Sequence, residues 1–469
     1  MTHSSTSEQH VDLIVIGAGS GNSLIGPEFH DKTVALLDDG RWFGGTCLNA
    51  GCIPTKMFVH VADVAAHAAD APRIGLSFTR DPVDWLAIRD RVFAKTDKIS
   101  RAGFRYRDEK SPNVTVFRET FRFDGPRTLV SASGVRLSGE QIVIAAGSRP
   151  RPLEVPHDGD DPALHTSDSI MRIDALPASL TILGGGAVAV EFAHVFSALG
   201  VRVTLVARSE RLLTELDHEI SERFTALASE HWSLRLGAHL GGVARDGAEL
   251  VVSLDGGEEL RSELVLVAQG RIPNADRLGA ASAGYDLEAD GRLAVDHHQR
   301  ALSGGEPVAG VYGLGDVSSM WELKHVANHE ARIVEHNLAH PHELIGGHPG
   351  PVPSAIFSRP QIAHFGLTEE QARRSHPDAV VVVQEYRTTA YGWALEDVTS
   401  ICKLVVDRET ALLLGAHIVG PEASILIQPL IQAASQGLSI RGLARGQYWP
   451  HPAASEVVEN ALLKAEEEL

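Results

Sequence analysis

Two cysteines close together in the sequence are the residues best suited to chemistry. Cys47 and Cys52 lie in the stretch GGTCLNAGCIPTKMF (44–58), and the whole chain of 469 residues has only three cysteines. Paired thiols can hold a metal, staple a fold or carry electrons. A structural zinc site needs four nitrogen or sulfur ligands, usually in short-spaced pairs, and the sequence places no second Cys or His pair to complete one. We therefore predict no metal site.

The spacing of the two cysteines favours a redox couple. In one straight helix five residues rise about 7.5 Å, whereas the Cα atoms of a disulfide lie within about 6.8 Å of each other. The chain must therefore leave regular helix between the cysteines, and Gly51 is the residue that permits it. Pro54 suits the first turn of a new helix, so we expect Cys52 at a helix N-terminus, where the thiolate is favoured. A small, strained loop with one thiolate-prone sulfur predicts a reducible disulfide.

Two charged residues in apolar surroundings are further candidates. Lys56 follows Cys52 in the first turn of the predicted helix, and Glu191 stands in the apolar stretch AVAVEF (187–192). Lys56 is either a surface lysine whose ammonium reaches water or a buried cation that needs a carboxylate partner. Glu191 is the candidate for that partner.

Two glycine-rich turns indicate the elements that position these residues. VDLIVIGAGSGNS (11–23) and SLTILGGGAVAVEF (179–192) each run from an apolar strand through a glycine turn into a helix-like stretch. Such a turn lets the backbone approach a pyrophosphate, whose charge is favoured at a helix N-terminus. Two copies in this setting predict two dinucleotide-binding folds. The glycines that define the turns are Gly17 and Gly19 in the first copy and Gly184 and Gly186 in the second.

The residues that follow each turn distinguish the two nucleotides. Asp38 ends the strand after the first turn, where an acid can hydrogen-bond the ribose of an adenosine. Ala207 and Arg208 end the corresponding second strand, so the acid is missing and a cation stands beside its position. This favours the 2′-phosphate of NADPH over NADH, and a solvated surface arginine is the alternative. Asn22 replaces the third glycine of the first motif, so we expect the following helix to pack slightly further from its strand.

The composition bounds the class of protein. The chain is too long for one core, and we expect about three domains. A formal net charge of −19 argues against a nucleic-acid partner, which needs a basic surface. The longest apolar run contains Glu191 and His194, so no membrane span is expected. The polar N-terminus MTHSSTSEQH lacks the features of a signal peptide, and together with the few cysteines this predicts a cytoplasmic protein.

Further apolar strands extend the pattern. SGEQIVIAAGSRP (138–150), RSELVLVAQGRIPN (261–274) and VAGVYGLGDVSS (308–319) are buried strands that end in small-residue turns. From residue 351 onward, AVVVVQEYR, ICKLVVD and LLLGAHIVG predict the strands of a separate α+β domain without a glycine fingerprint. The predicted fold class is α/β, with two Rossmann-like nucleotide-binding domains and a C-terminal α+β domain.

Taken together, these motifs resemble those of the flavoprotein disulfide reductases, the family of glutathione reductase and dihydrolipoamide dehydrogenase. GGTCLNAGCIPTK is highly specific, and the likeness covers essentially all of the chain. GAGSGNS, KHVANHEAR, SILIQPLIQAASQGLS and ARGQYWPHPA are similar to the branch that reduces mycothione, the disulfide of mycothiol. The resemblance implies an FAD-binding domain in two parts (1–152 and 276–350), an NADPH-binding domain (153–275) and a C-terminal dimerisation domain (351–469).

The resemblance also implies a role for each site residue. Cys52 would stack against the flavin as a thiolate, and Cys47 would attack the substrate disulfide. His451, oriented by Glu456, matches the HPxxxE motif of the family and would exchange protons with the thiols. Lys56 would pair with Glu191 near the flavin. The cofactor-binding residues implied for FAD and NADPH are Gly17, Gly19, Asp38, Thr46, Lys56, Gly147, Asp316, Gly184, Gly186, Glu191 and Arg208.

In the family this histidine reaches the active site of the other subunit, so the resemblance implies a homodimer with no nucleic-acid or membrane partner. The implied reaction is the reduction of mycothione by NADPH to two molecules of mycothiol. Dihydrolipoamide dehydrogenase shares the catalytic residues but normally uses NAD, and Arg208 is the residue that discriminates. A flavin-containing redox sensor is an alternative of another class, and the intact set of Cys47, Cys52, His451 and Glu456 counts against it.

Overall fold

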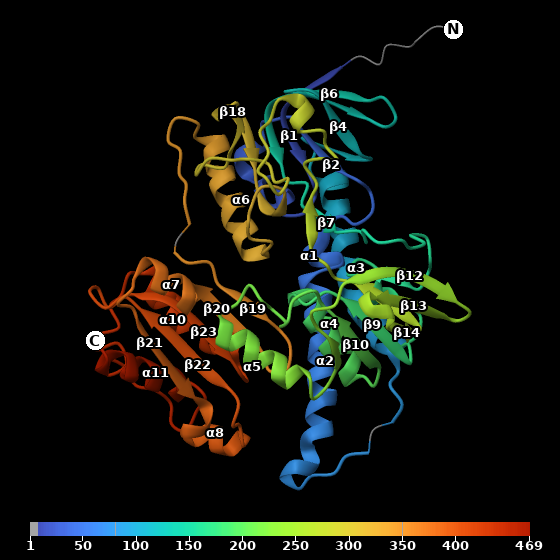
Figure 1. The fold of residues 1–469 in the computed structure, drawn as a ribbon. Coiled ribbons are helices and arrows are strands. Elements are labelled where there is room, and N and C mark those ends of the chain that lie inside the picture. Colours follow the sequence, from blue (N-terminus) through green and yellow to red (C-terminus); the bar gives the residue numbers. More distant parts are fainter. Residues whose placement is uncertain (1–7, 80, 349) are drawn as a thin grey trace.

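The computed structural model describes residues 8–79, 81–348 and 350–469, so the first seven residues of the N-terminus that we read for a signal peptide lie outside it. Three bodies are visible in Figure 1. A large sheet lies at the top, a second sheet lies at the lower right, and the C-terminal residues form a third sheet at the lower left. The long helix α2 (Cys52–Asp70) starts near the junction of these bodies and runs down beside the second sheet.

The first body is a mostly parallel sheet with the strand order β17-β18-β6-β1-β2-β3. Its central strands are apolar and buried, which is typical of a parallel sheet covered on both faces. Ile16 pairs with both Leu37 and Ile144, so the turns after β1, β2 and β6 open at the same edge. The strands are β1 (Gln9–Ile16), β2 (Val34–Asp38), β3 (Val114–Arg118), β4 (Phe121–Gly125), β5 (Thr128–Ser131), β6 (Arg136–Ile144), β17 (Arg300–Ser303) and β18 (Glu306–Gly313).

The second body is a smaller parallel sheet with the order β11-β10-β9-β15-β8. Leu183 at the end of β9 pairs with Val206 and Val267, so this sheet also has a shared edge where its turns open. An antiparallel ribbon of β12, β13 and β14 extends from it. The strands are β8 (Leu164–Thr166), β9 (Ser179–Leu183), β10 (Arg202–Val206), β11 (Ser233–Arg235), β12 (Leu240–Asp246), β13 (Glu249–Leu254), β14 (Glu259–Ser262) and β15 (Leu264–Val267).

The same glycine turn occurs after the first strand of each sheet. Gly17 has a φ of +108°, and a Cβ there would lie 2.2 Å from the carbonyl oxygen of Ala145. Gly184 has a φ of +136°, and a Cβ there would lie 2.1 Å from the carbonyl oxygen of Ala268. Because both the backbone angle and the space admit only glycine, the two turns are built alike. The predicted pair of Rossmann-like folds is confirmed.

The prediction of a helix directly after the first glycine turn was wrong. The second turn leads into α4 (Ala187–Ala198) as predicted, but the first leads only into the short 3-10 helices η1 (Gly21–Leu24) and η2 (Pro27–Phe29). Pro27 lacks a backbone N–H and its ring clashes with a preceding helical turn, so an α-helix begun at Gly21 could not continue through it.

Asn22, the residue in place of the third glycine, is held by a long helix instead. Arg107 in α3 (Trp85–Lys110) donates from Nε to Asn22 Oδ1 at 2.7 Å and from its guanidinium to the carbonyl of Asn22 at 2.8 Å. It also donates to the carbonyl of Ile25 at 3.1 Å. Burial lowers the pKa of Arg107. The first turn is therefore fixed by a side chain from α3 rather than by close packing of a helix on its strand.

The third body is an antiparallel sheet with the order β19-β20-β23-β22-β21. Cys402 is fully buried in it, as expected for a small apolar side chain. The sequence-predicted strands and the separate α+β domain are confirmed. Its elements are β19 (Ser354–Ile356), β20 (Ile362–Gly366), α7 (Glu369–Ser375), β21 (Val380–Glu385), α8 (Ala390–Leu395), β22 (Ile401–Val406), β23 (Leu413–Val419), α9 (Ala423–Leu426), α10 (Gln428–Ser435) and α11 (Glu456–Glu467).

A buried charge cluster joins the second and third bodies. Lys403 of β22 is 2% exposed, and its Nζ lies 2.9 Å from Asp217, which caps α5 (His218–Ala228), and 2.8 Å from Glu369 of α7. A buried ammonium needs such partners because an unpaired one is costly to desolvate. None of the helices in the described ranges is both long and apolar enough to cross a membrane.

Candidate active site

The two cysteines lie on either side of a break between two helices. Cys47 is inside α1 (Gly45–Asn49), and Cys52 is the first residue of α2, so the predicted break and the predicted position of Cys52 are confirmed. A Cβ at Gly51 would lie 3.0 Å from the carbonyl oxygen of Thr46 and 3.3 Å from the Cα of Cys47. A side chain at Gly51 would therefore need its neighbours to move by a few tenths of an ångström, so glycine suits the close approach of the two ends of the break.

The negative charge of the reduced pair belongs on Cys52. The Cys47 thiol donates a hydrogen bond to Cys52, and this bond, more than the charge of Lys56 or the backbone N–H of Cys52 itself, lowers the pKa of Cys52 to about 7 against the opposing effect of burial. The same bond raises the pKa of Cys47. The sequence predicted a thiolate at Cys52 from the helix N-terminus alone, and the structure adds that the neighbouring thiol is the larger cause.

Lys56 and Glu191 form the ion pair that the sequence suggested. Lys56 Nζ lies 2.6 Å from Glu191 Oε2 and 2.7 Å from Oε1, which joins α2 to α4. The backbone N–H of Phe357 also donates to Glu191 Oε1 at 2.9 Å, and the Lys56 ammonium lies 4.8 Å from the centre of the Phe357 ring. Phe357 was not predicted, because only the fold brings this segment of the third body to α4.

A cavity of about 720 Å³ contains both cysteines and opens along the shared edge of the first sheet. A Cβ at Gly45 would lie 2.7 Å from the Cα of Gly19, so the helix that carries Cys47 rests directly on the glycine turn. A glycine turn, an acid at the end of β2 and a large adjoining cavity fit a flavin dinucleotide. The predicted site residues that line the cavity are Gly17, Gly19, Asp38, Thr46, Cys47, Cys52, Lys56, Gly147, Glu191 and Asp316.

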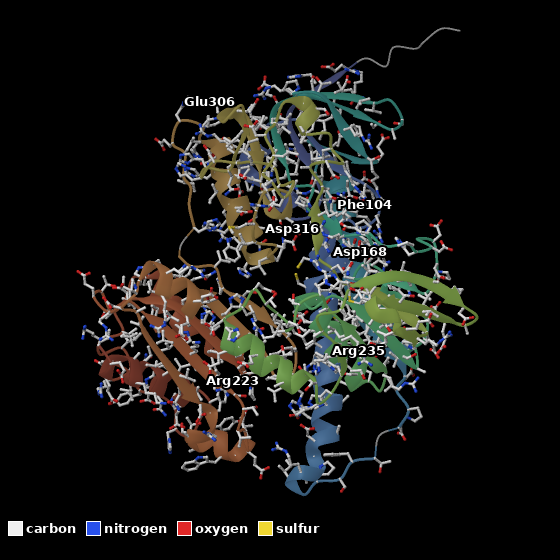
Figure 2. All side chains as sticks on the ribbon, viewed as in Figure 1. Phe104, Asp168, Arg223, Arg235, Glu306 and Asp316 are labelled. Carbon is white, nitrogen blue, oxygen red and sulfur yellow. The ribbon has the colours of Figure 1, made fainter. Side chains whose placement is uncertain are left out.

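Two aspartates in the cavity have distinct surroundings. Asp38 ends β2, accepts a hydrogen bond from the backbone N–H of Gly40 at 2.9 Å, and has its pKa raised by burial. Asp316, labelled in Figure 2 close to the junction of the bodies, accepts from Ser148 Oγ at 2.7 Å. Ser148 in turn accepts from Arg271 Nε at 2.7 Å. Ser148 and Arg271 went unpredicted because they meet only through the pairing of β7 (Ser148–Pro150) with β16 (Arg271–Pro273).

The second glycine turn offers a separate nucleotide site. A Cβ on Gly186, which caps the N-terminus of α4, would meet no atom within 4 Å, so the backbone there is open to a ligand. Arg208 follows the end of β10, is exposed, and has no hydrogen-bond or ion-pair partner in the described part of the chain. Its guanidinium is therefore free for a phosphate. These three residues (Gly184, Gly186 and Arg208) do not line the cysteine cavity, but Ala187, Val188 and Glu191 of α4 do.

His451 and Glu456 lie apart from the cysteines. His451 Nδ1 is 2.6 Å from Glu456 Oε1, and Glu456 is the first residue of α11. The histidine side chain is 70% exposed, and the residues that line the cysteine cavity come from segments before residue 356. Within one chain the structure therefore brings together the sulfurs and the ion pair but not the predicted proton donor.

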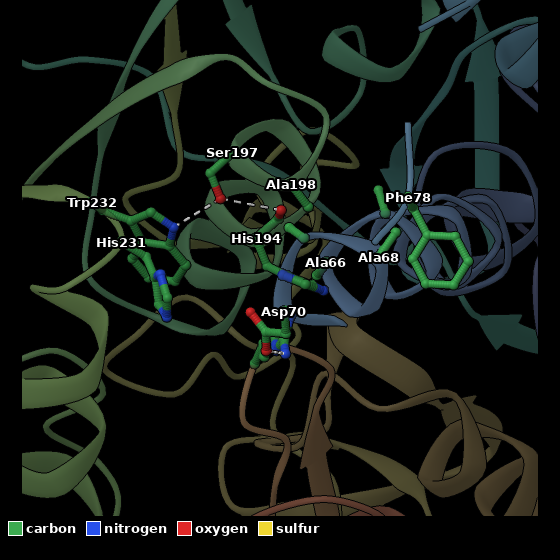
Figure 3. A pocket seen from close by; sticks show the side chains of 12 residues that line it. Ala66, Ala68, Asp70, Phe78, His194, Ser197, Ala198, His231 and Trp232 are labelled. Atoms are coloured by element: carbon green, nitrogen blue, oxygen red, sulfur yellow. Dashed lines mark hydrogen bonds and ion pairs between the residues drawn. The ribbon is translucent and has the colours of Figure 1, made fainter. Parts of the chain in front are cut away.

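Another pocket, of about 420 Å³, lies between α2, α4 and the start of the third body, and Figure 3 shows it. His194 of α4 forms an ion pair with Asp63 of α2 at 2.7 Å, and Arg359 pairs with Asp70. Trp232 donates from its indole to Ser197 at 2.9 Å. This pocket contains no sulfur atom, and its charged pairs hold α2 against its neighbours. Within the residues that the structure describes, no three His, Cys, Asp or Glu side chains are grouped to bind a metal ion.

Comparisons with known proteins agree with this geometry. Residues 11–331 match the model of the pyridine nucleotide-disulphide oxidoreductases, and residues 352–462 match the dimerisation domain of the same family. The chain is 49% identical to mycothione reductase from Mycobacterium tuberculosis over 96% of its length and 98% of that protein. It is 32% identical to dihydrolipoyl dehydrogenase from Thermus scotoductus over 95% of both chains. The HOCl-induced flavoprotein disulfide reductase RclA from Escherichia coli superposes with a TM-score of 0.83 at 25% identity, over 96% of this chain and 99% of that one.

The chain belongs to the pyridine nucleotide-disulphide oxidoreductase family. It is an oxidoreductase that acts on sulfur groups, and its cofactors are FAD and NADPH. With the family's dimerisation domain at its C-terminus, it forms a homodimer.

Proposed function

We propose that this protein reduces mycothione to mycothiol with electrons from NADPH, through FAD and a redox-active pair formed by Cys47 and Cys52. The observation that carries the proposal is the sulfur pair itself, with one thiol hydrogen-bonded to a sulfur whose pKa lies near 7. The choice of mycothione is supported by the relative of 49% identity that is named for it. Mycothiol is a small thiol, so the same site has to admit a small disulfide.

The cofactors would occupy the two glycine turns. Gly17, Gly19 and Asp38 would hold the FAD nucleotide, with Thr46, Gly147 and Asp316 along the same cavity. NADPH would bind at Gly184, Gly186 and Arg208. When bound, FAD would take the hydride of NADPH and deliver an electron pair to sulfur. The Lys56–Glu191 pair fixes a positive charge at the wall of this cavity, beside Cys52.

The sulfur chemistry follows from the charges on the pair. Two electrons open the Cys47–Cys52 bond and leave a thiolate on Cys52 and, with one proton, a thiol on Cys47. After losing that proton, Cys47 attacks one sulfur of the substrate disulfide, forms a mixed disulfide and releases the first thiolate, which takes up a proton. The Cys52 thiolate then attacks Cys47, restores the Cys47–Cys52 bond and releases the second thiolate, which takes up one proton from solvent. One NADPH and one proton thus give two thiols.

The proton transfers would come from His451 of the partner subunit, oriented by Glu456. Imidazole can take the proton of Cys47 and give one to the leaving thiolate near neutral pH. The support is that His451 is exposed on its own chain while already oriented by a carboxylate at 2.6 Å. An exposed, oriented imidazole fits a role in a neighbouring subunit.

Arg208 would set the preference for NADPH. We expect Arg208→Ala to raise the KM for NADPH about tenfold or more and to leave the KM for NADH nearly unchanged, because a charge-assisted bond to the 2′-phosphate is lost. Arg202→Ala is the matched control, since Arg202 is exposed at the other end of β10. Equal changes for both coenzymes would place the 2′-phosphate elsewhere.

The substrate is tested by NADPH oxidation measured side by side with mycothione, oxidised glutathione and lipoamide. The proposal predicts the highest kcat/KM for mycothione. A preference for lipoamide together with NADH would replace the proposal with a dihydrolipoamide dehydrogenase. A flavoprotein that NADPH reduces but that turns over none of the three would favour a redox sensor.

We also propose the cytoplasm as the location and domain boundaries at residues 152/153, 275/276 and 350/351. The location is supported by the use of NADPH and by two thiols that must be kept reducible. The boundaries are supported by the second parallel sheet, whose strands all lie between residues 164 and 267, and by the first sheet, which takes strands from both sides of that range.

A further inference from the structure

A lysine stands where helix electrostatics disfavours it, at the edge of the cysteine cavity. Lys324 is the first residue of α6 (Lys324–Ala339), and no acidic residue accompanies it in the first turn. The N-terminus of a helix carries a partial positive charge, so a cation there is electrostatically disfavoured. Lys324 also lines the cavity that contains Cys47 and Cys52. A placement that costs stability at an active site calls for a functional reason.

Lys324 shares the cavity wall with the carboxylates of Asp316 and Glu322 but is not paired with either. Its Nζ donates to Ser20 Oγ at 2.7 Å, and Ser20 belongs to the first glycine turn. Within the described residues Lys324 forms no ion pair with a carboxylate. The neutral hydroxyl holds the side chain in place without contributing a negative charge, in contrast to Lys56, whose ammonium is held by the carboxylate of Glu191.

The reaction creates a need for such a charge. Cys47 has to ionise beside the Cys52 thiolate, and the hydrogen bond between the two sulfurs, burial and the negative charge of Cys52 all raise the pKa of Cys47. The charge of Lys324 acts in the opposite direction and favours the ionised form of Cys47. A hydrogen-bonded histidine withdraws the proton more readily when the thiolate that forms is stabilised by a nearby cation.

We propose that Lys324 is a positioning residue for thiol–disulfide exchange, whose fixed positive charge stabilises the thiolate of Cys47. It acts through Cys47. Ser20, which accepts from the Lys324 ammonium, follows Gly19, and a Cβ on Gly45 of α1, the helix that carries Cys47, would lie 2.7 Å from the Cα of Gly19. The inference rests on the proposed function, in which Cys47 is the thiol that attacks the substrate.

The test measures ionisation of Cys47 directly, without the disulfide substrate. The holoenzyme is reduced with NADPH in the absence of oxygen and treated with iodoacetamide between pH 5.5 and 9, and the modified cysteine is identified by peptide mass mapping. Iodoacetamide is neutral, so its rate reports the thiolate rather than attraction of a charged reagent. In Lys324→Thr we expect alkylation of Cys47 at pH 7 to slow by about three- to tenfold, with the pH midpoint shifted upward by about half to one unit.

Two further variants separate charge from structure. Lys324→Arg keeps the charge and should restore most of the rate, whereas Lys98→Thr, an exposed lysine of α3, should match the wild type. An unchanged pH profile of Cys47 alkylation in Lys324→Thr would overturn the inference. If that variant also binds flavin more weakly, Lys324 would instead be assigned to the nucleotide, through its hydrogen bond to Ser20. In the proposed function the flavin covers the Cys52 thiolate and leaves Cys47 open to the reagent, so label found mainly on Cys52 of the wild type would contradict that function rather than the role of Lys324.

Discussion

The identity of the charged sulfur depends on the neighbour that each cysteine has. Cys52 receives a hydrogen bond from Cys47 and lies near the ammonium of Lys56, whereas Cys47 is left with its proton. A thiolate held in this way is stable near neutral pH yet still able to attack an adjacent sulfur, since its nucleophilicity is highest when its pKa is close to the ambient pH. In the proposed exchange reaction, each half would therefore use the sulfur that is suited to it.

Serine replacements separate the two sulfurs. We expect Cys47→Ser to retain a long-wavelength absorbance band from the Cys52 thiolate against the flavin, and Cys52→Ser to keep the flavin but lose the band. The band should fade as the pH falls below about 7, because the lowered pKa of Cys52 keeps it ionised only above that value. Cys47→Ala removes the hydrogen bond donated to Cys52. The pH at which half of the band is lost should therefore lie about one to two units higher in Cys47→Ala than in Cys47→Ser. If Cys47→Ser lost the band and Cys52→Ser kept it, the roles of the two sulfurs would be exchanged.

Individual residues differ in how far the sequence reveals them. Cys47, Cys52, Lys56 and Glu191 were predictable because each has an unusual type for its apolar or helix-terminal surroundings. Ser148 and Arg271 carry no such signal, since serine and arginine are ordinary in loops and their contact with Asp316 arises from long-range strand pairing. Lys324 could have been noticed as a lysine at the start of an amphipathic helix, but its place in the wall of the cysteine cavity could not.

At the scale of elements, two glycine turns of the same geometry carry different continuations. α4 follows the second turn and brings Glu191 back to the cysteines, whereas the first turn is followed by short 3-10 helices. The periodicity and the glycine spacing predicted the turns correctly because backbone angle and space fix them. The sequence prediction missed the break after the first turn, because the glycine motif predicts an α-helix there whereas Gly26 and Pro27 disfavour one.

Arg107 compensates for the missing helix, and its removal tests this. We expect Arg107→Ala to lower the free energy of unfolding by about 1–3 kcal/mol, because Asn22 and two carbonyl groups lose a half-buried donor. The variant should also release flavin faster on gel filtration, since the first turn is less well held. Arg105→Ala, an exposed position on the same helix, is the control for both measurements. Equal stability and flavin retention in the two variants would show that α3 does not fix the turn.

At the scale of the whole molecule, one chain keeps the sulfurs and the predicted proton donor apart. The sulfurs face a cavity between the first two bodies, and the His451–Glu456 pair lies on the third body, exposed to solvent. The buried cluster around Lys403 fixes the third body to the second, so the position of His451 relative to its own cysteines is set by the fold. The three bodies could be predicted from fingerprints and strand patterns, whereas their relative placement could not, because it depends on such isolated cross-contacts.

Mixed dimers test the sharing of the site. A Cys47→Ser subunit paired with a His451→Ala subunit has one site with an intact cysteine pair and an intact histidine from the partner. We therefore expect purified heterodimers, isolated with two affinity tags, to recover about half of the wild-type activity while both parent homodimers remain slow. Heterodimers as inactive as their parents would show that the histidine serves its own chain.

The central claim is that an electron pair from NADPH comes to rest on two sulfurs. An anaerobic titration of the holoenzyme with one equivalent of NADPH, followed by thiol quantification under denaturing conditions, tests it most directly. We expect two additional thiols per chain, traced to Cys47 and Cys52, with the oxidised flavin spectrum largely retained and a long-wavelength band present. A bleached flavin with no new thiols would contradict it.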